Sequence, residues 1–318
     1  MKDKGVALMS VLLIVLILSS IAVIIGNNYF ISLKRAAYIE FQSNSLNLFK
    51  GMEFLGKKKI NQEIKFTEAI AKNNSMFVNN IFLEDENGYI FSEIFDASTC
   101  FNINNLVTKN EDTYSPNPED IKVFKKLMSL KDIDERLVNQ MIDQIIDWID
   151  LDSVPRNNGL EDYFYTGPSN PNQQYTNNRM FYSKNELKNL PSFSGDEWEL
   201  FSRFLCAYPV SDFKVNLNTI AEEDAILLSS FFTELSIDDA KFILSTMPDS
   251  GYKNLNEIYI DYSDITFGEA VGSSAFKSNI FLLKTTSKVD SFESSSSSII
   301  HFKNNSNGYI LSRNYNGI

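Results

Sequence analysis

The densest group of side chains with chemistry to offer is an acidic stretch near the middle of the chain. It contributes five carboxylates, Asp147, Asp150, Asp152, Glu161 and Asp162. Calcium binds about six to eight oxygen atoms, several of them from carboxylates, on a segment that can wrap around the ion. The stretch therefore predicts a calcium site. The competing interpretation is an acidic surface loop that follows the end of a helix.

The spacing of these carboxylates is similar to that of an EF-hand only in part. Asp150, Asp152 and Glu161 take the first, third and twelfth places of such a loop. Val154 and Pro155 take the fifth and sixth places, where an EF-hand requires an oxygen ligand and glycine. The segment is therefore not an EF-hand. A set of hard oxygen ligands also argues against zinc or copper.

The remaining reactive side chains point to no catalytic site. The one histidine, His301, lies in a strand-like run, and no nucleophile-elbow motif accompanies it. With one histidine, the only cysteines, Cys100 and Cys206, cannot complete a Cys/His zinc set. They can form one disulfide in an oxidising compartment, and two free buried thiols are the alternative.

An apolar stretch at the N-terminus is the strongest signal in the sequence. Residues 6–25 contain neither charge nor proline, and about 20 apolar residues suffice for a helix that crosses a bilayer. Only residues 1–5 precede this stretch. Lys2 and Lys4 favour retention of this short segment in the cytoplasm. The pattern therefore predicts a single-pass membrane protein with a short cytoplasmic tip, whose bulk lies outside the cytoplasm.

The rest of the chain predicts strands, then helices, then strands. Apolar periodicity continues the N-terminal helix to about residue 60. A turn signal at residues 86–88 between apolar runs predicts a β-hairpin. Amphipathic stretches predict helices at residues 121–130, 135–149, 184–190, 195–207, 221–232 and 237–247. Strands are expected again at residues 279–288, 299–302 and 308–312, with a serine-rich loop at residues 294–298.

The N-terminus resembles the class III signal of type IV pilins and pseudopilins. In that family a prepilin peptidase cuts after a glycine that precedes the apolar stretch, and the new N-terminal amine is methylated. The resemblance assigns these processing roles to Gly5 and Val6. Pilins usually carry glutamate at the fifth mature position, which is Ser10 here. K-type minor pseudopilins of bacterial type II secretion systems are the members known for lacking this glutamate.

Internal segments extend the resemblance to K-type pseudopilins over nearly the whole chain. Residues 95–106 are similar to the segment that enters their inserted helical domain. Residues 147–163 are similar to a segment of that domain, which binds calcium. Residues 213–223 also resemble the opening of DNA-binding helix-hairpin-helix modules, but the glycine hairpin of those modules is missing. K-type pseudopilins carry the same motif without binding DNA.

The resemblance implies an α+β fold in which a large, mainly helical domain interrupts an antiparallel pseudopilin sheet behind a long N-terminal pilin-like helix. The implied divisions are a prepilin leader at residues 1–5, a transmembrane and assembly helix at 6–60, sheet regions at 61–110 and 275–318, and an inserted α-domain at 111–274.

The implied function is structural and not enzymatic. Such a subunit sits at the tip of the type II secretion pseudopilus and nucleates its assembly for protein export across the outer membrane. The implied partners are the I- and J-type minor pseudopilins, prepilin peptidase and the inner-membrane assembly platform, with secreted substrates as a further candidate. The net charge of −12 disfavours a nucleic acid partner.

Two other functions are compatible with an anchored protein of this composition. A minor pilin of a type IV pilus or competence system would bind DNA or surfaces, and a basic patch or a glycine hairpin would support it. A membrane-anchored periplasmic enzyme would need a pocket that gathers carboxyl groups with shifted pKa values.

Overall fold

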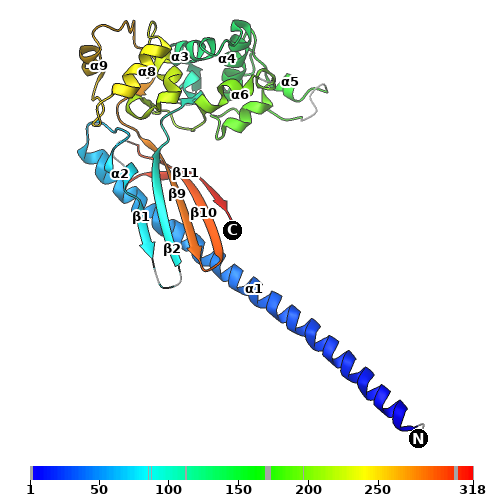
Figure 1. Cartoon of the computed structure of the whole chain (residues 1–318). Helices are drawn as coiled ribbons and strands as arrows, with labels where there is room; N and C mark the ends of the chain where they lie inside the picture. The colour runs from blue at the N-terminus through cyan, green and yellow to red at the C-terminus, as the bar shows by residue number, and fades with distance from the viewer. Residues whose placement is uncertain are drawn as a thin grey trace.

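The structure, a computed structural model, describes residues 3–84, 86, 88–111, 113–168, 173–195, 197–303 and 307–317. Met1 and Lys2 of the expected leader and Asn87 of the expected turn lie outside the described residues. Figure 1 shows a long helix, a sheet packed beside its second half, and a helix-rich body at the end far from the N-terminus.

Helix α1 (Asp3–Phe66) starts in the apolar N-terminal stretch and runs past the predicted residue 60. Every side chain from residue 8 to residue 40 is exposed. Among the described residues, α1 is the one helix that is long and apolar enough to cross a membrane, with a mean hydropathy of 3.1 in its most apolar window. From Phe41 onward buried side chains recur. The first half of α1 therefore projects alone and its second half packs against the rest of the chain.

The main sheet has the strand order β1-β2-β9-β10-β11, and each neighbouring pair is antiparallel. Its strands are β1 (Ile81–Glu84), β2 (Gly88–Asp96), β9 (Ile280–Val289), β10 (Phe292–His301) and β11 (Tyr309–Asn316). The predicted hairpin is confirmed, because β1 pairs with β2 from Ile81 opposite Ser92 to Glu84 opposite Tyr89. Strands β2 and β9 are far apart in sequence and adjacent in the sheet.

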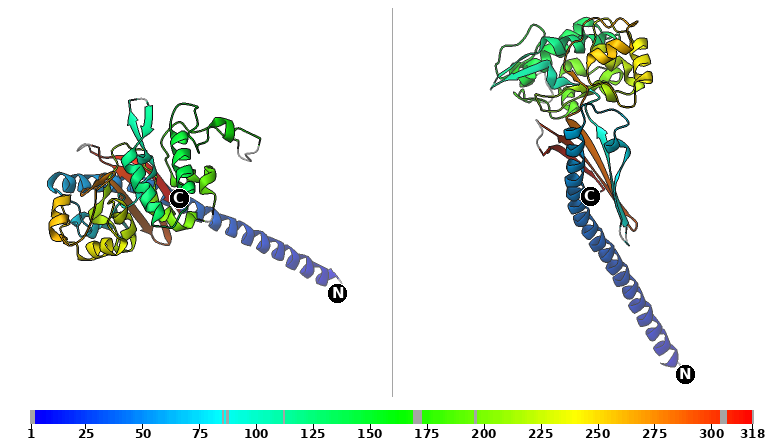
Figure 2. Two further views of the ribbon diagram at one scale, coloured as in Figure 1. Left: turned by 90° about the horizontal axis from the view of Figure 1, so that it is seen from above. Right: turned by 90° about the vertical axis from the view of Figure 1, so that its left-hand side faces the viewer.

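One face of the sheet packs on the second half of α1 (Figure 2). Ile60 and Ile64 of α1 belong to one buried cluster with Ile94 of β2 and Leu283 of β9. Gly56 allows a close approach, because a Cβ atom there would lie 3.1 Å from the Leu283 side chain. This contact fixes the sheet on the helix close to the end of β2 and the start of β9, between which the helix-rich region is inserted.

The serine-rich segment at residues 294–298 was expected to be a loop, and that expectation is wrong. These residues lie within β10, where all five pair with β9 and residues 295–298 also pair with β11. Ser294, Ser296 and Ser298 are buried. Serine has a weak intrinsic preference for strands, but pairing on both sides and burial of one face override local propensity.

A buried ion pair joins α1 to the sheet beside these serines. Glu53 of α1 is 4% exposed, and it accepts hydrogen bonds from Arg313 Nε at 2.7 Å and Nη2 at 2.8 Å. The hydroxyl of Ser298 donates a third bond at 2.6 Å. Burial alone would raise the pKa of Glu53, but the bonds from Arg313 and Ser298 outweigh it and lower that pKa. The small serine side chains leave the space that this ion pair occupies.

Between β2 and β9 the chain forms a helix-rich region around one large apolar core. Its α-helices are α3 (Pro118–Ser129), α4 (Glu135–Ile149), α5 (Asp162–Tyr165), α6 (Trp198–Phe201), α7 (Ala225–Ser230), α8 (Ile237–Thr246) and α9 (Leu255–Asp261). The short helix α2 (Ser75–Val78) lies outside this region, between α1 and β1 in the sequence. Its short strands pair as β3 (Phe101–Asn102) with β6 (Leu205–Cys206), β4 (Val107–Asn110) with β5 (Thr113–Pro116), and β7 (Val215–Asn216) with β8 (Ser274–Ala275).

The strongest helix predictions are confirmed in this region. Helix α4 spans the predicted residues 135–149, and Asp134 caps its N-terminus by accepting from the backbone N–H groups of Arg136 and Leu137. The predicted helix at 184–190 is a 3-10 helix, η2 (Lys184–Asn189). The predicted helix at 195–207 ends early, because after α6 and the 3-10 helix η4 (Ser202–Phe204) the chain enters β6. Pairing with β3 takes over from the local helical pattern there.

Two asparagine turns hold distant loops of this region together. Asn104 exchanges two hydrogen bonds with the backbone of Phe181, at 2.9 and 2.8 Å. Asn218 does the same with the backbone of Tyr252, at 2.8 and 2.9 Å. Both asparagines are buried. In the segment at 213–223, which is similar to a helix-hairpin-helix opening, the side chain of Asn218 is therefore buried and hydrogen-bonded within the protein.

A candidate metal centre after helix α4

The last turn of α4 delivers the first carboxylates of the acidic stretch to one place. Asp147 is buried on that turn, Asp150 caps the C-terminus of the helix, and Asp152 follows in an exposed position. The chain then loops back to Glu161, which is 2% exposed and precedes α5. Segments eleven residues apart thus face each other because the loop between them closes on the end of α4.

Three of the predicted ligands come together as a group. Asp150, Asp152 and Glu161 each offer an oxygen atom, and these oxygens lie within 4.8 Å of one another. Calcium–oxygen distances are about 2.3–2.6 Å, so two oxygens on one ion are separated by roughly 5 Å at most. The spacing of the three carboxylates therefore fits a single ion of calcium's size.

Hydrogen bonding within the group also fits a cation. Among the described residues, Asp150 Oδ1 and Glu161 Oε1 are buried and have no hydrogen-bond partner. Buried carboxylate oxygens in proteins are almost always paired with a donor or a metal ion. A cation would satisfy both atoms at once. The chemistry of the donor set is hard oxygen only, which suits calcium or magnesium and not a soft metal.

Asp147 stands behind this group and is held by Arg156. The backbone N–H of Arg156 donates to Asp147 Oδ2 at 3.0 Å, and its Nε lies 3.4 Å from Asp147 Oδ1. The same guanidinium lies 3.8 Å from Asp150 Oδ2. Gly159 is also required here, because a Cβ atom would lie 1.8 Å from Asp147 Oδ2. Asp147 therefore orders the loop through its neighbours.

Asp162 is turned to a different partner. Its Oδ1 accepts hydrogen bonds from the backbone N–H and the hydroxyl of Thr176, both at 2.7 Å. These bonds fasten the start of α5 to a segment fourteen residues further along the chain. The structure thus brings together three of the five predicted carboxylates and gives Asp147 and Asp162 supporting contacts at its edges.

Burial and mutual repulsion shift the pKa values of these acids upward in the protein chain alone. Burial raises the pKa of Asp147 to about 7, against the opposing hydrogen bond from the Arg156 backbone. Burial and the charge of Asp152 raise the pKa of Asp150 to about 6. Burial and the neighbouring aspartates raise the pKa of Glu161 to about 7. A divalent cation would reverse the balance by stabilising the ionised forms.

The centre rests on an aromatic wall of the large core. The rings of Trp148 and Tyr165 meet edge to face with centroids 4.9 Å apart. Phe181 stacks on Trp148 at 6.3 Å. All three side chains are at most 1% exposed. The end of α4 and the start of α5 are therefore held by packing, and the loop between them depends on its polar contacts.

The other predicted site residues lie elsewhere. Cys100 and Cys206 form a disulfide with an S–S distance of 2.07 Å. It links the chain just before β3 to the end of β6. Gly5 and Val6 are in the first turns of α1, where only the backbone is described.

Several residues that complete the centre had no role in the sequence-based interpretation. Arg156 and Gly159 were part of the acidic stretch, and an arginine between acids is a recognisable signal for a charge partner. Thr176 lies fourteen residues beyond Asp162, and no pattern connects the two positions. Its part follows only from the way the chain folds back.

Comparisons with known proteins give a consistent result. Residues 99–210 match the family model described as "Type II secretion system (T2SS), protein K". The chain is 29% identical to type II secretion system protein K of Pectobacterium carotovorum subsp. carotovorum, over 80% of this chain and 78% of that protein. It is 27% identical to the corresponding protein of Aeromonas hydrophila, over 79% and 78%.

A solved structure shows the same fold. It is titled as the GspK-GspI-GspJ complex from the enterotoxigenic Escherichia coli type 2 secretion system, and a chain in it matches with a TM-score of 0.73 and 19% identity. The match covers 89% of this chain and 99% of that chain. In sequence the chain is thus similar to type II secretion system protein K, over residues 99–210 and along about four fifths of its length, and in fold it matches the solved structure.

Proposed function

We propose that this protein is the minor pseudopilin at the tip of a type II secretion pseudopilus, and that it nucleates assembly of the filament. The observation that carries the proposal is the position of the folded regions along α1. The helix-rich region sits at the end of α1 far from the N-terminus, beyond the sheet (Figure 1). A body of that size above the sheet would block the stacking of another subunit and suits a terminal position.

The exposed first half of α1 supplies the means of assembly. Its side chains from residue 8 to residue 40 are exposed, and most of residues 8–25 are large and apolar. In the membrane this segment anchors the protein, and in a filament it packs with the equivalent helices of neighbouring subunits. We propose the I- and J-type minor pseudopilins as those neighbours, since the structural relative is described in a complex with GspI and GspJ.

Maturation follows from the same helix. Prepilin peptidase is proposed to cut between Gly5 and Val6, which leaves the body of the protein in the periplasm and the apolar helix in the inner membrane. The inner-membrane assembly platform would then extract the subunit. Ser10 at the fifth mature position agrees with a terminal subunit, because such a subunit needs no buried carboxylate to pair with a neighbour above it.

We further propose that Asp150, Asp152 and Glu161 hold one structural calcium ion, with Asp147 and Asp162 ordering the loop around it. The support is the 4.8 Å spacing of the three oxygens and the unpaired buried oxygens of Asp150 and Glu161. When bound, the ion supplies positive charge that fixes the loop and no chemical step. The role of the protein remains structural, and its calcium stabilises the folded state by mass action.

The tip position can be tested by immunogold labelling of pseudopili in cells that overproduce the major pseudopilin. An epitope placed at the exposed Tyr175 reports the helix-rich region. The proposal predicts gold at one end of each filament, and co-purification of the I- and J-type subunits with the tagged protein. Gold spread along the filament shafts, or a tagged protein recovered without either subunit, would contradict a tip role.

A further inference from the structure

A cavity of about 280 Å³ opens where the helix-rich region meets the sheet, apart from the acidic loop. The β4–β5 hairpin contributes Lys109 and Tyr114 to its lining, and the segment after α5 contributes Arg179 and Tyr182. The sheet contributes His301 of β10. The cavity therefore joins parts of the chain that are far apart in sequence, and a ligand in it would touch both the helix-rich region and the sheet.

The charge of this cavity is opposite to that of the protein as a whole. The chain has a net charge of −12. Three cationic side chains, Lys109, Arg179 and Lys303, line the cavity against one carboxylate, Asp212. Cations gathered in a concave site focus the local field and attract anionic groups. The cavity is thus a positive site on an acidic molecule.

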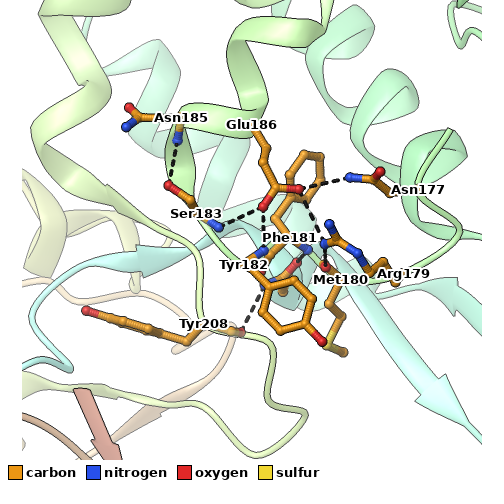
Figure 3. A network of polar contacts seen from close by, with 10 residues as sticks. Asn177, Arg179, Met180, Phe181, Tyr182, Ser183, Asn185, Glu186 and Tyr208 are labelled. Atoms are coloured by element: carbon orange, nitrogen blue, oxygen red, sulfur yellow. Dashed lines mark hydrogen bonds and ion pairs between the residues drawn. The ribbon is translucent and has the colours of Figure 1, made fainter. Parts of the chain in front are cut away.

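Arg179, which lines this cavity, is held in place by a network of hydrogen bonds around Glu186, shown in Figure 3. Glu186 accepts the backbone N–H groups of Tyr182 and Ser183 at Oε1 and the side chain of Asn177 at Oε2. Arg179 Nη1 donates to Glu186 Oε2 at 3.3 Å and to the carbonyl oxygen of Met180 at 2.8 Å. Both bonds are made by Nη1, and a guanidinium carries further N–H donors.

The side of the cavity formed by the sheet is also fixed by hydrogen bonds. His301 is 1% exposed. Its Nε2 lies 2.9 Å from Asp212 Oδ1, and its Nδ1 lies 2.7 Å from the hydroxyl of Tyr309. Since a carboxylate only accepts, the hydrogen of the first bond belongs to Nε2. This chain of bonds holds the ring of Tyr309 at the cavity and engages Asp212 Oδ1.

Tyrosine rings stand next to the cations around the opening. Arg179 lies 4.5 Å from the ring centroid of Tyr182, and Lys109 lies 5.9 Å from that of Tyr114. Tyr182 is 60% exposed and Tyr309 is 45% exposed. Exposed tyrosines beside cations are typical of protein recognition surfaces, because the rings provide apolar contact and the hydroxyls provide hydrogen bonds.

We propose that this cavity binds a carboxylate-bearing peptide segment of a partner protein. Lys109, Lys303 and Arg179 would bind the carboxylate, and Tyr182 and Tyr309 would pack against the adjoining peptide. The carboxylate can belong to an aspartate or glutamate side chain or to a free C-terminus. The proposal goes beyond the tip role and does not depend on calcium.

The test uses the full chain in detergent at low ionic strength, where charged contacts are least screened. Isothermal titration calorimetry measures three pentapeptides of otherwise equal sequence. The first has two aspartates and blocked ends, the second has asparagines in their place, and the third has asparagines with a free C-terminus. Lys109→Gln with Lys303→Gln is the test variant. Lys122→Gln with Lys241→Gln, two exposed lysines of the helix-rich region, is the control with the same change of charge.

Binding of the aspartate peptide, or of the free C-terminal peptide, supports the proposal and tells which carboxylate is recognised. The test variant should weaken that binding by about tenfold, the loss expected from a charged hydrogen bond, and the control variant should leave it unchanged. Thermal melting confirms that both variants are folded. Equal binding of all three peptides, no binding of any, or an equal loss in both variants would overturn the proposal.

Discussion

Two acidic sites in this protein, the single carboxylate of Asp96 and the group of Asp150, Asp152 and Glu161, differ in how their oxygen atoms are satisfied. At the end of β2, Asp96 accepts the backbone N–H of Ser98 at Oδ1 and the side chains of Asn216, Thr219 and Ser278 at Oδ2. After α4, one oxygen of Asp150 and one of Glu161 are buried with no donor. Burial raises the pKa of Asp96 as it does in the acidic loop, but in the loop like charges add to that effect.

The difference teaches how a buried acid is accommodated. Asp96 is surrounded by backbone, amide and hydroxyl groups that donate hydrogen bonds, so its oxygens are satisfied within the protein. The loop gathers acids around one arginine and offers too few donors. The Asp96 cluster is therefore complete within the protein and links the sheet to the helix-rich region, whereas the acidic loop keeps unpaired oxygens that suit the cation proposed above.

The largest expected effect is that of calcium on stability. At a thousandfold excess over the dissociation constant, calcium should raise the free energy of unfolding by about 4 kcal/mol, since it binds only the folded loop. Thermal melting of the full chain in calcium and in chelator measures this difference. Magnesium should give a smaller increase, because it dehydrates reluctantly and requires a tighter geometry.

The matched control for that experiment is the pair Asp150→Asn with Glu161→Gln. It keeps the size of both side chains and removes the charges that attract the ion. Its melting temperature should be the same in calcium and in chelator. Equal melting temperatures for the unmodified protein would show instead that the loop is an ordinary acidic surface segment.

The Asp96 cluster should respond to mutation and not to calcium. Asp96→Ala leaves several donors without an acceptor, and each buried unsatisfied group costs about 1–3 kcal/mol, partly recovered by water. We expect a loss of about 3 kcal/mol in chelator and the same loss in calcium, measured by chemical denaturation. A calcium-dependent loss would mean that the two clusters are coupled and would break the contrast between them.

The disulfide between Cys100 and Cys206 provides another test of whether the acidic loop is independent of its surroundings. Cys100 follows Asp96 closely in sequence. The bond closes a loop with a sequence separation of 106 residues that contains the whole acidic stretch. Cys100→Ser with Cys206→Ser should lower the free energy of unfolding by about 2–4 kcal/mol through the greater freedom of the unfolded chain. The increment given by calcium should survive in this variant, since the disulfide contributes no ligand. Loss of that increment would contradict the independence of the loop.

The smallest effect concerns Glu53, a buried acid whose partner is a cation. Its pKa is lowered by Arg313 and Ser298. A lowered folded-state pKa gives stability that is present above the unfolded pKa of about 4.3 and is lost as the pH falls through the folded value. Glu53→Gln should therefore destabilise by roughly 1 kcal/mol at pH 7, with a smaller difference at pH 3. A difference that stays constant with pH would argue against the ion pair.

Much of the fold could be predicted because its signals are local. The apolar stretch of α1, the hairpin of β1 and β2, and the periodicity of α4 each follow from neighbouring residues. The serines at 294–298 were taken for a loop because their strand character comes from β9 and β11 and not from themselves. Composition alone gave no sign of the buried face that they form against α1.

The candidate centre was predictable in its residue types and less so in its membership. Five carboxylates were predicted as ligands, and the structure brings three of them, Asp150, Asp152 and Glu161, together. Asp162 was grouped with them by proximity in sequence, but its Oδ1 bonds to Thr176. The pairing of Cys100 with Cys206 was left open, since no sequence pattern can bring two residues so far apart into contact.

The central claim, the proposal that this protein is processed and assembled as a pseudopilin, is tested most directly by the intact mass and N-terminal sequence of the protein recovered from membranes. The measurement compares cells with and without prepilin peptidase. The account predicts a mature chain that begins at a methylated Val6 only when the peptidase is present. An intact Met1 in both, or a cut after the apolar stretch, would contradict it and would favour a plain membrane-anchored protein.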